Sequence, residues 1–215
     1  MKTLKYSTVL FYTLLAISMI GISSCGSTGI ERSEEATSTM DKMDSEIKLV
    51  VVQLDATNAS LDGVMKTGQM DVKKAFDLFT KNTEKMAKME GEFAKQSDEM
   101  KARGKDYFSE WQKEGSKYKN PRIQQLSEQR RNTLGNTYGQ IAENSKGVKD
   151  AFRAYVSDIK EIQKFLSNDL TTGGIQAILP ISQRVVNAGD NLKYNIRNVQ
   201  TAIESARKEM EQTGI

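Results

Sequence analysis

The chain has 215 residues, with 31 Lys and Arg against 28 Asp and Glu, and it contains no histidine and one cysteine, Cys25. The lack of histidine excludes Ser-His-Asp and Cys-His nucleophiles and the Glu-x-x-His pairs of di-iron bundles, and one cysteine is too few for structural zinc. Two prolines and 7% aromatic residues, with many Lys, Glu, Ala and Met, are typical of long helices. No cofactor or metal is expected.

Residues 1–24 have the pattern of a secretory signal peptide. Lys2 and Lys5 precede an apolar run over 9–20, which is short for a membrane span of about 20 residues. The segment ends in Ile22-Ser23-Ser24-Cys25-Gly26, which has the form of a bacterial lipobox. We therefore predict lipidation of Cys25, with palmitate-like acyl chains that anchor the chain on a membrane. The alternatives are an ordinary secretory signal with an incidental cysteine, or an uncleaved anchor helix.

Loss of the signal would remove two basic residues and no acidic ones, so the rest of the chain is close to neutral. That balance argues against a nucleic-acid partner, whose phosphates attract strongly basic proteins, and against a broadly polybasic membrane surface. We expect a lipid-anchored protein of the bacterial cell envelope. Because glycine rather than aspartate follows Cys25, we expect it on the outer membrane, facing the periplasm.

Residues 25–39 are small, polar and aperiodic, and they predict a flexible tether of roughly 20 Å. From Met40 to Val64, apolar residues then recur in steps of three and four, which predicts a first helix. Glycines near 63–68 predict a turn at 66–70, with Asp71 as the N-cap of the next helix.

Two long helices of similar length follow. The same spacing continues over 72–118 and again over 123–166, and the first of these helices should end at Asn120-Pro121, because the residue before a proline avoids the helical region. A turn at 171–174, in which Thr171 or Thr172 could cap, leads to a fourth helix with a seam from Ile181 to Met210. Pro180 either starts this helix or kinks one that began earlier.

The helix lengths predict an all-α fold: an elongated antiparallel coiled coil or four-helix bundle, formed by residues 40–215 as a single helical domain. The first helix covers about 28 residues and the central two about 48 each, so the central hairpin should project by roughly 20–30 Å. Its tip at 118–121 would lie at the same end as the N-terminal anchor and the C-terminus.

Glycines occur inside the central two helices, where each costs about 1 kcal/mol relative to alanine. They are either tolerated surface positions or points of close helix approach. Those within the central two helices are Gly91, Gly104, Gly115, Gly135, Gly139 and Gly147.

Aromatic and basic residues concentrate near the predicted tip. Trp111, Tyr118, Lys119 and Arg122 are the candidate residues for contact with a membrane or a protein partner, since Trp and Tyr favour such boundaries. The alternative is that Tyr107, Trp111 and Tyr118 simply pack against the following helix.

The same region carries a family resemblance. Residues 108–114 (Phe-Ser-Glu-Trp-Gln-Lys-Glu), 118–122 (Tyr-Lys-Asn-Pro-Arg), Ser127, Leu134 and Tyr138 resemble a bacterial family known as domain of unknown function 2959. Phe152, Ile175 and residues 165–170 are similar to a later motif of that family, and the resemblance covers about residues 40–210. Where the family tends to carry Lys-His-Asn-Leu-Asn, this chain has Ser-Asn-Asp-Leu-Thr at 167–171. The resemblance implies a helical fold and a lipobox-bearing or secreted protein, and it implies no reaction.

These observations favour a non-enzymatic envelope lipoprotein, a helical scaffold or spacer that binds an unknown envelope protein. The alternative is a membrane-associating module that acts on the bilayer through its hairpin tip. An enzyme would instead require a deep pocket that holds carboxylates of raised pKa. The sequence leaves the partner and the oligomeric state open.

Overall fold

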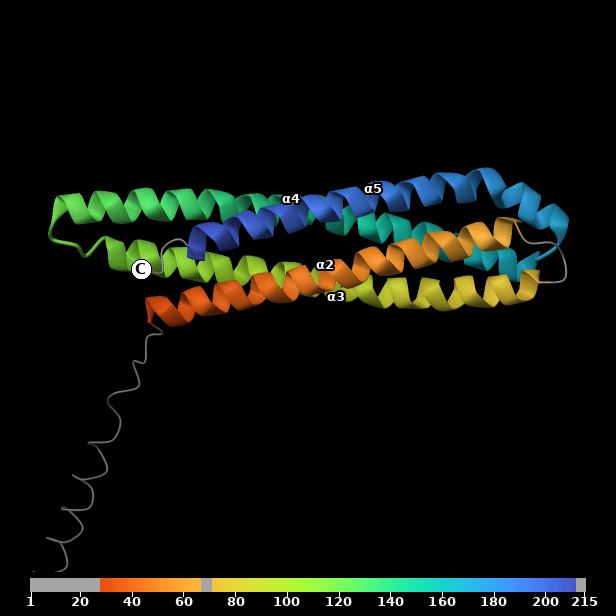
Figure 1. The fold of residues 1–215 in the computed structure, drawn as a ribbon, viewed down its shortest axis with the longest axis horizontal. Helices are drawn as coiled ribbons and strands as arrows, with labels where there is room; N and C mark the ends of the chain where they lie inside the picture. The colour runs from red at the N-terminus through yellow and green to blue at the C-terminus, as the bar shows by residue number, and fades with distance from the viewer. Residues whose placement is uncertain (1–27, 67–70, 212–215) are drawn as a thin grey trace, which may run out of the picture.

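The computed structural model describes residues 28–66 and 71–211, which form four α-helices. They are α2 (Gly29–Lys66), α3 (Val72–Gly115), α4 (Pro121–Asn168) and α5 (Thr172–Glu211). The helices run alternately in opposite directions, and the start of α2, the α3–α4 connection and the end of α5 share one end of the rod (Figure 1). The predicted all-α, elongated four-helix bundle is confirmed. The predicted signal peptide and Cys25 lie outside the described residues.

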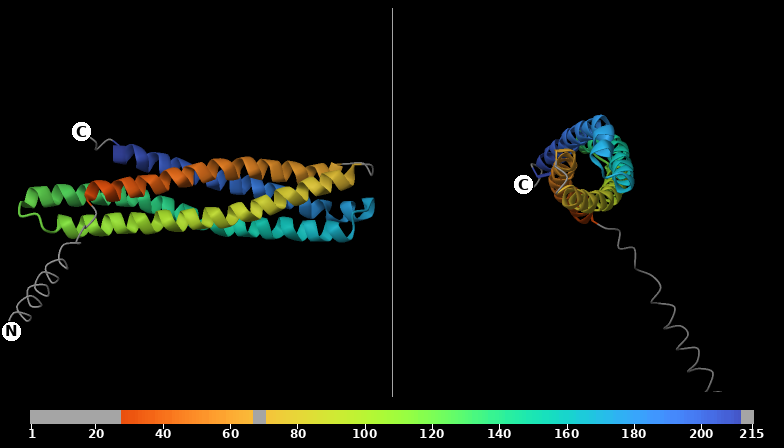
Figure 2. Two further views of the ribbon diagram at one scale, coloured as in Figure 1. Left: turned by 90° about the horizontal axis from the view of Figure 1, so that it is seen from below. Right: turned by 90° about the vertical axis from the view of Figure 1, so that its right-hand side faces the viewer.

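The four helices surround a common central axis in the end-on view (Figure 2). The buried apolar side chains of the described residues form a core along this axis. Around the bundle, α2 packs on α3, α3 on α4, α4 on α5, and α5 on α2. The seam predicted for the first helix is entirely buried, because each of its positions faces this core. Its members are Met40, Met43, Ile47, Val50, Leu54, Thr57, Leu61 and Val64.

The expected tether at 25–39 is wrong from Gly29 onward, because α2 begins there rather than at Met40. Thr28 and Glu31 form a capping box: the Thr28 N–H donates to Glu31 Oε2 at 2.6 Å, and the Glu31 N–H donates to Thr28 Oγ1 at 3.2 Å. Ala36 and Thr39 then enter the core. The polar composition of this segment masked a helix that has a cap and a narrow apolar face.

The earlier start of α2 shortens the projecting hairpin. Glu35 of α2 pairs with Arg103 of α3 at 3.1 Å, and this antiparallel register places Gly29 about six residues before the end of α3. The hairpin therefore extends about 10 Å beyond the start of α2, rather than the expected 20–30 Å.

The structure resolves the alternatives for the fourth helix. α5 begins at Thr172 and contains Pro180, and the Thr171 hydroxyl caps it by accepting a hydrogen bond from the Gly174 N–H at 3.2 Å. In the first half of this helix the predicted seam is correct at Val185, which is buried, and wrong at Ile181, which is exposed. The buried positions that were not predicted are Gly174, Ile175, Ile178, Ser182 and Gly189.

Gly189 lies at a level of the core where buried side chains are polar. The Tyr155 hydroxyl of α4 donates to Asn58 Oδ1 of α2 at 2.8 Å, and Asn58 Nδ2 donates to the Val186 carbonyl of α5 at 3.1 Å. A Cβ atom at Gly189 would lie only 2.7–2.8 Å from the Asn58 and Tyr155 side chains. Three helices therefore meet in one buried polar layer, and a side chain at position 189 would collide with it.

The helical glycines fall into both of the expected classes. A Cβ atom at Gly104 would lie 2.0 Å from the Tyr138 ring, whose hydroxyl donates to the Met100 carbonyl. By contrast, a Cβ at Gly91 on the same helix would meet no atom within 4 Å. Gly104 is thus a point of close helix approach, whereas Gly91 is a tolerated surface position.

This contrast gives a paired prediction. Gly91→Ala should stabilise the protein by up to about 1 kcal/mol through helix propensity. Gly104→Ala should instead destabilise it by about 2–3 kcal/mol, because the buried ring of Tyr138 must move. Urea unfolding followed by circular dichroism measures both effects. A stabilising Gly104→Ala substitution would show that Tyr138 is not tightly packed there.

Candidate functional site

The hairpin tip is a short, well-capped connection between α3 and α4. α3 ends at Gly115, and the Asn120 side chain accepts hydrogen bonds from the N–H groups of Arg122 at 2.9 Å and Ile123 at 3.4 Å. Pro121 occupies the first position of α4, where its missing N–H costs no helical hydrogen bond. The predicted break at Asn120-Pro121 is confirmed as the start of α4, but the preceding helix, expected to continue to 118, ends earlier, at Gly115.

Apolar side chains on the tip face outward. Tyr118 is 46% exposed, Ile123 is 50% exposed and Leu126 is 66% exposed. Ile123 and Leu126 were expected to be seam positions, and that expectation is wrong, because α2 and α5 do not extend far enough to cover them (Figure 1). The tip therefore presents three large apolar side chains.

Basic side chains surround this apolar surface. Lys117 pairs with Glu114 at 2.7 Å, and this contact lowers the pKa of the Glu114 carboxyl. Lys119 and Arg122 are exposed and form no ion pair with any residue that the structure describes. We call the exposed side chains of Tyr118, Lys119, Arg122, Ile123 and Leu126 the tip surface.

Trp111, the remaining predicted contact residue, lies behind the tip surface. Its indole N–H donates to the Ser127 hydroxyl of α4 at 2.9 Å, and its ring stacks on Phe108 at a centroid separation of 6.5 Å. Phe108 in turn meets the edge of Tyr138 at 5.7 Å. The packing interpretation therefore fits Trp111, whereas Tyr118 is 46% exposed. No pattern in the sequence indicates that the Ser127 hydroxyl accepts a hydrogen bond from the indole N–H.

A cavity of about 240 Å³ adjoins this aromatic cluster, where α2 begins and α5 ends. Its lining residues are Ser33, Tyr107, Trp111, Arg130, Leu134 and Met210. Burial raises the pKa of the Tyr107 hydroxyl. The guanidinium of Arg130 also bonds the Glu209 backbone carbonyl, so this side chain ties the end of α5 to the hairpin.

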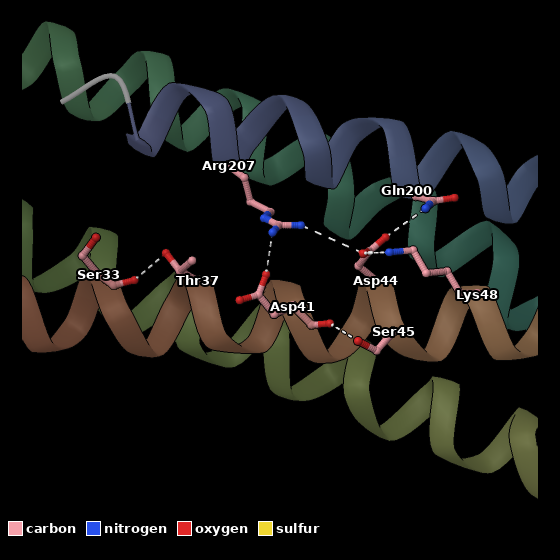
Figure 3. A network of polar contacts seen from close by, with 8 residues as sticks. All are labelled: Ser33, Thr37, Asp41, Asp44, Ser45, Lys48, Gln200 and Arg207. Atoms are coloured by element: carbon pink, nitrogen blue, oxygen red, sulfur yellow. Dashed lines mark hydrogen bonds and ion pairs between the residues drawn. The ribbon is translucent and has the colours of Figure 1, made fainter. Parts of the chain in front are cut away.

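A polar network joins the first half of α2 to the last half of α5 (Figure 3). Arg207 pairs with Asp41 at 3.0 Å, and Asp44 accepts hydrogen bonds from Gln200 at 3.0 Å and Lys48 at 2.7 Å. The Asp44 side chain is only 10% exposed, so these contacts are partly shielded from water. The network holds residues 200–207 of α5 against residues 41–48 of α2.

Within residues 28–66 and 71–211, no group of three or more Cys, Asp and Glu side chains is arranged to hold a metal ion. A search of the same residues finds no helix with the length and apolar character of a bilayer span.

The family model described as protein of unknown function DUF2959 matches residues 28–213. The chain belongs to this family. The match begins at Thr28, the residue that caps α2, and so includes the segment expected to be a tether. Searches of curated proteins and of solved structures give no match.

The contact between Trp111 and Ser127 predicts a local energetic effect. Ser127→Ala removes the acceptor of the partly buried indole N–H and should lower the free energy of unfolding by about 1 kcal/mol. Trp111 is the only tryptophan, so its fluorescence during urea unfolding reports this site directly. Ser109→Ala, an exposed position on α3, is the matched control and should leave the midpoint unchanged.

The buried Tyr138 predicts a loss of stability in alkali. Burial raises the pKa of its hydroxyl to about 12, whereas an unfolded tyrosine ionises near pH 10. The folded chain therefore keeps this proton longer, and the stabilisation present below pH 10 should fall by about 1.4 kcal/mol per pH unit between pH 10 and 12. Tyr138→Phe should reduce this slope, whereas Tyr194→Phe, on the surface, should not. Urea unfolding at several pH values measures it.

Proposed function

We propose that the protein is a non-enzymatic helical scaffold of the bacterial cell envelope, lipid-anchored at Cys25, that binds another envelope component through its hairpin tip. The observation that carries this proposal is the joint location of two features. The start of α2, which follows the predicted anchor, lies at the same end of the rod as the tip surface.

The shape of the bundle supports a spacer role. α3 and α4 contain 44 and 48 residues, so the rod is about 70 Å long. The buried layer of Asn58 and Tyr155 links three of the helices about 20 Å from the end of α4 that lies opposite the tip, and it opposes their sliding past one another. Such a rod can hold a bound component at a fixed distance from its other end.

The tip surface favours binding over a purely mechanical role. Exposed apolar side chains grouped in one patch are a common feature of interaction sites. Here the patch of Tyr118, Ile123 and Leu126 is bordered by the unpaired cations Lys119 and Arg122. An envelope protein with an acidic rim around an apolar pocket would complement this arrangement.

A second candidate function is contact between the tip and the anchoring bilayer. Tyrosine and exposed aliphatic side chains enter the membrane interface, while Lys and Arg attract anionic headgroups at about 1 kcal/mol each. The combination found at the tip surface therefore also suits a membrane that contains anionic lipid.

Vesicle co-sedimentation separates the two functions. If the tip binds lipid, the unlipidated chain should sediment with anionic vesicles, and replacement of Tyr118, Lys119 and Arg122 by serine should weaken this binding roughly thirtyfold. Replacement of Leu78 and Lys81 by serine, at the far end of the rod, is the control. If the chain does not bind vesicles but a photocrosslinker at Tyr118 captures one envelope protein, the scaffold function is supported. Failure of both measurements would contradict a role for the tip.

The anchor itself is tested by Cys25→Ser. This substitution removes the predicted acylation site and should move the protein from the membrane fraction to the soluble fraction after cell lysis. Ser24→Ala, which keeps a small residue beside the cysteine, should leave the protein in the membrane fraction. Membrane retention of Cys25→Ser would contradict lipid anchoring.

A further inference from the structure

The central part of α2 is apolar on its outward face as well as on its core face. Between Lys48 and Lys66, the exposed residues of α2 are Leu49, Val52, Asp55, Ala56 and Ala59. Leu49 and Val52 are 60% and 68% exposed. A helix that is apolar all round is normally buried on every side, so this face is unusual for a surface helix.

The neighbouring helix shows the contrast. At the same height, given by the hydrogen bond between Gln53 of α2 and Asn82 of α3 at 3.1 Å, α3 exposes mainly charged residues, and Leu78 is its one large apolar residue that is exposed there. The charged residues are Asp77, Lys81, Glu84 and Lys85. The one charge on the outward face of α2, Asp55, pairs with Lys193 of α5 at 2.5 Å and is therefore neutralised within the chain.

The outward residues also have the spacing of a coiled-coil seam. Leu49, Val52, Ala56 and Ala59 follow one another in steps of three, four and three, which places them in one line along the helix. We call these four residues the outer seam. A line of this kind packs on a second helix that carries a line of its own.

We propose that the outer seam pairs with the outer seam of a second copy of this chain, with the two α2 helices antiparallel. In that orientation the larger pair, Leu49 and Val52, meets the smaller pair, Ala59 and Ala56, of the second copy. The sizes are therefore self-complementary about a two-fold axis near residue 54, as an isologous interface requires.

The charges beside the outer seam favour the same orientation. In this register Lys48, which pairs with Asp44 of its own chain, lies opposite Asp62 of the second copy, which pairs with Lys66 of its own chain, and the symmetry provides this contact twice. Asp55 approaches its own symmetry mate at the axis, but each carboxylate already carries its Lys193 partner. A parallel pair would place Lys48 near Gln53 and would bring no opposite charges together.

The outer seam is short, so the pair buries less surface than a stable soluble dimer. Pairing should therefore depend on the local concentration that confinement to a membrane provides. This pairing is independent of the tip surface, because α2 contributes no residue to the tip. Crosslinking in intact cells that express the full chain is consequently the suitable experiment.

Ala56→Cys, treated in cells with a short bis-maleimide, should give a crosslinked species of twice the chain mass. The parent chain, with Cys25 alone, supplies the background, and Ala154→Cys on the exposed face of α4 is the matched control that should add nothing to it. Addition of Val52→Lys should reduce the crosslinked fraction at least about tenfold, because it places two like charges in the contact. Leu78→Lys, an exposed apolar position on α3, should not reduce it.

A charge reversal tests the antiparallel register without altering the apolar residues. Lys48→Asp alone should lower the Ala56→Cys crosslink, because it faces Asp62 of the second copy. Lys48→Asp combined with Asp62→Lys should restore it. A crosslink no stronger than background, a product of a different mass, or indifference to both Val52→Lys and the charge reversal would overturn self-pairing.

Discussion

The arrangement of the bundle depends on one buried hydrogen bond, from the Tyr155 hydroxyl to Asn58. An apolar seam alone tolerates sliding of one helix along another, whereas a buried polar pair loses its partners when the register changes. Asn58 also reaches the Val186 carbonyl, so α2, α4 and α5 are fixed at the same height. Gly189 is the complement of this layer, because any larger residue would collide with both side chains. This buried layer fixes the position of α2 along the rod. It therefore also fixes how far the tip extends beyond α2, and which residues of α5 lie beside the polar network.

Helix number, order and direction could be predicted from the sequence because apolar residues at steps of three and four dominate α2, α3 and α4. Whereas the predicted seam of α5 from Leu192 to Ala206 is buried, the buried positions Ser182 and Gly189 in its first half could not be predicted, because they do not look like core residues. Their burial reflects a polar layer supplied by other helices. The start of α2 was missed because only Ala36 and Thr39 of the preceding polar segment enter the core.

The candidate site was predicted in part. The concentration of aromatic and basic residues correctly marked the hairpin tip, but pattern alone placed Trp111 with Tyr118, Lys119 and Arg122. The structure separates them, because the Trp111 indole N–H donates to Ser127, whereas the Tyr118 side chain is about half exposed. Ile123 and Leu126 belong to the tip surface only because the neighbouring helices end short of them. The exposure of these two residues depends on how far α2 and α5 extend along the hairpin. The sequence prediction started α2 at Met40 rather than Gly29, and so it gave the wrong relative helix lengths.

If Cys25 carries the proposed lipid, the capping box at Thr28 limits the distance between the helical bundle and the bilayer. A fully extended chain spans at most about 3.6 Å per residue, so only about 11 Å of chain can separate a lipid on Cys25 from the first helical turn. The hairpin extends beyond that turn by a similar distance. A lipidated chain therefore cannot stand clear of its bilayer, and its tilt decides whether the tip enters the headgroup layer. An antiparallel pair on one membrane would have an anchor at each end, and would be constrained to lie flat.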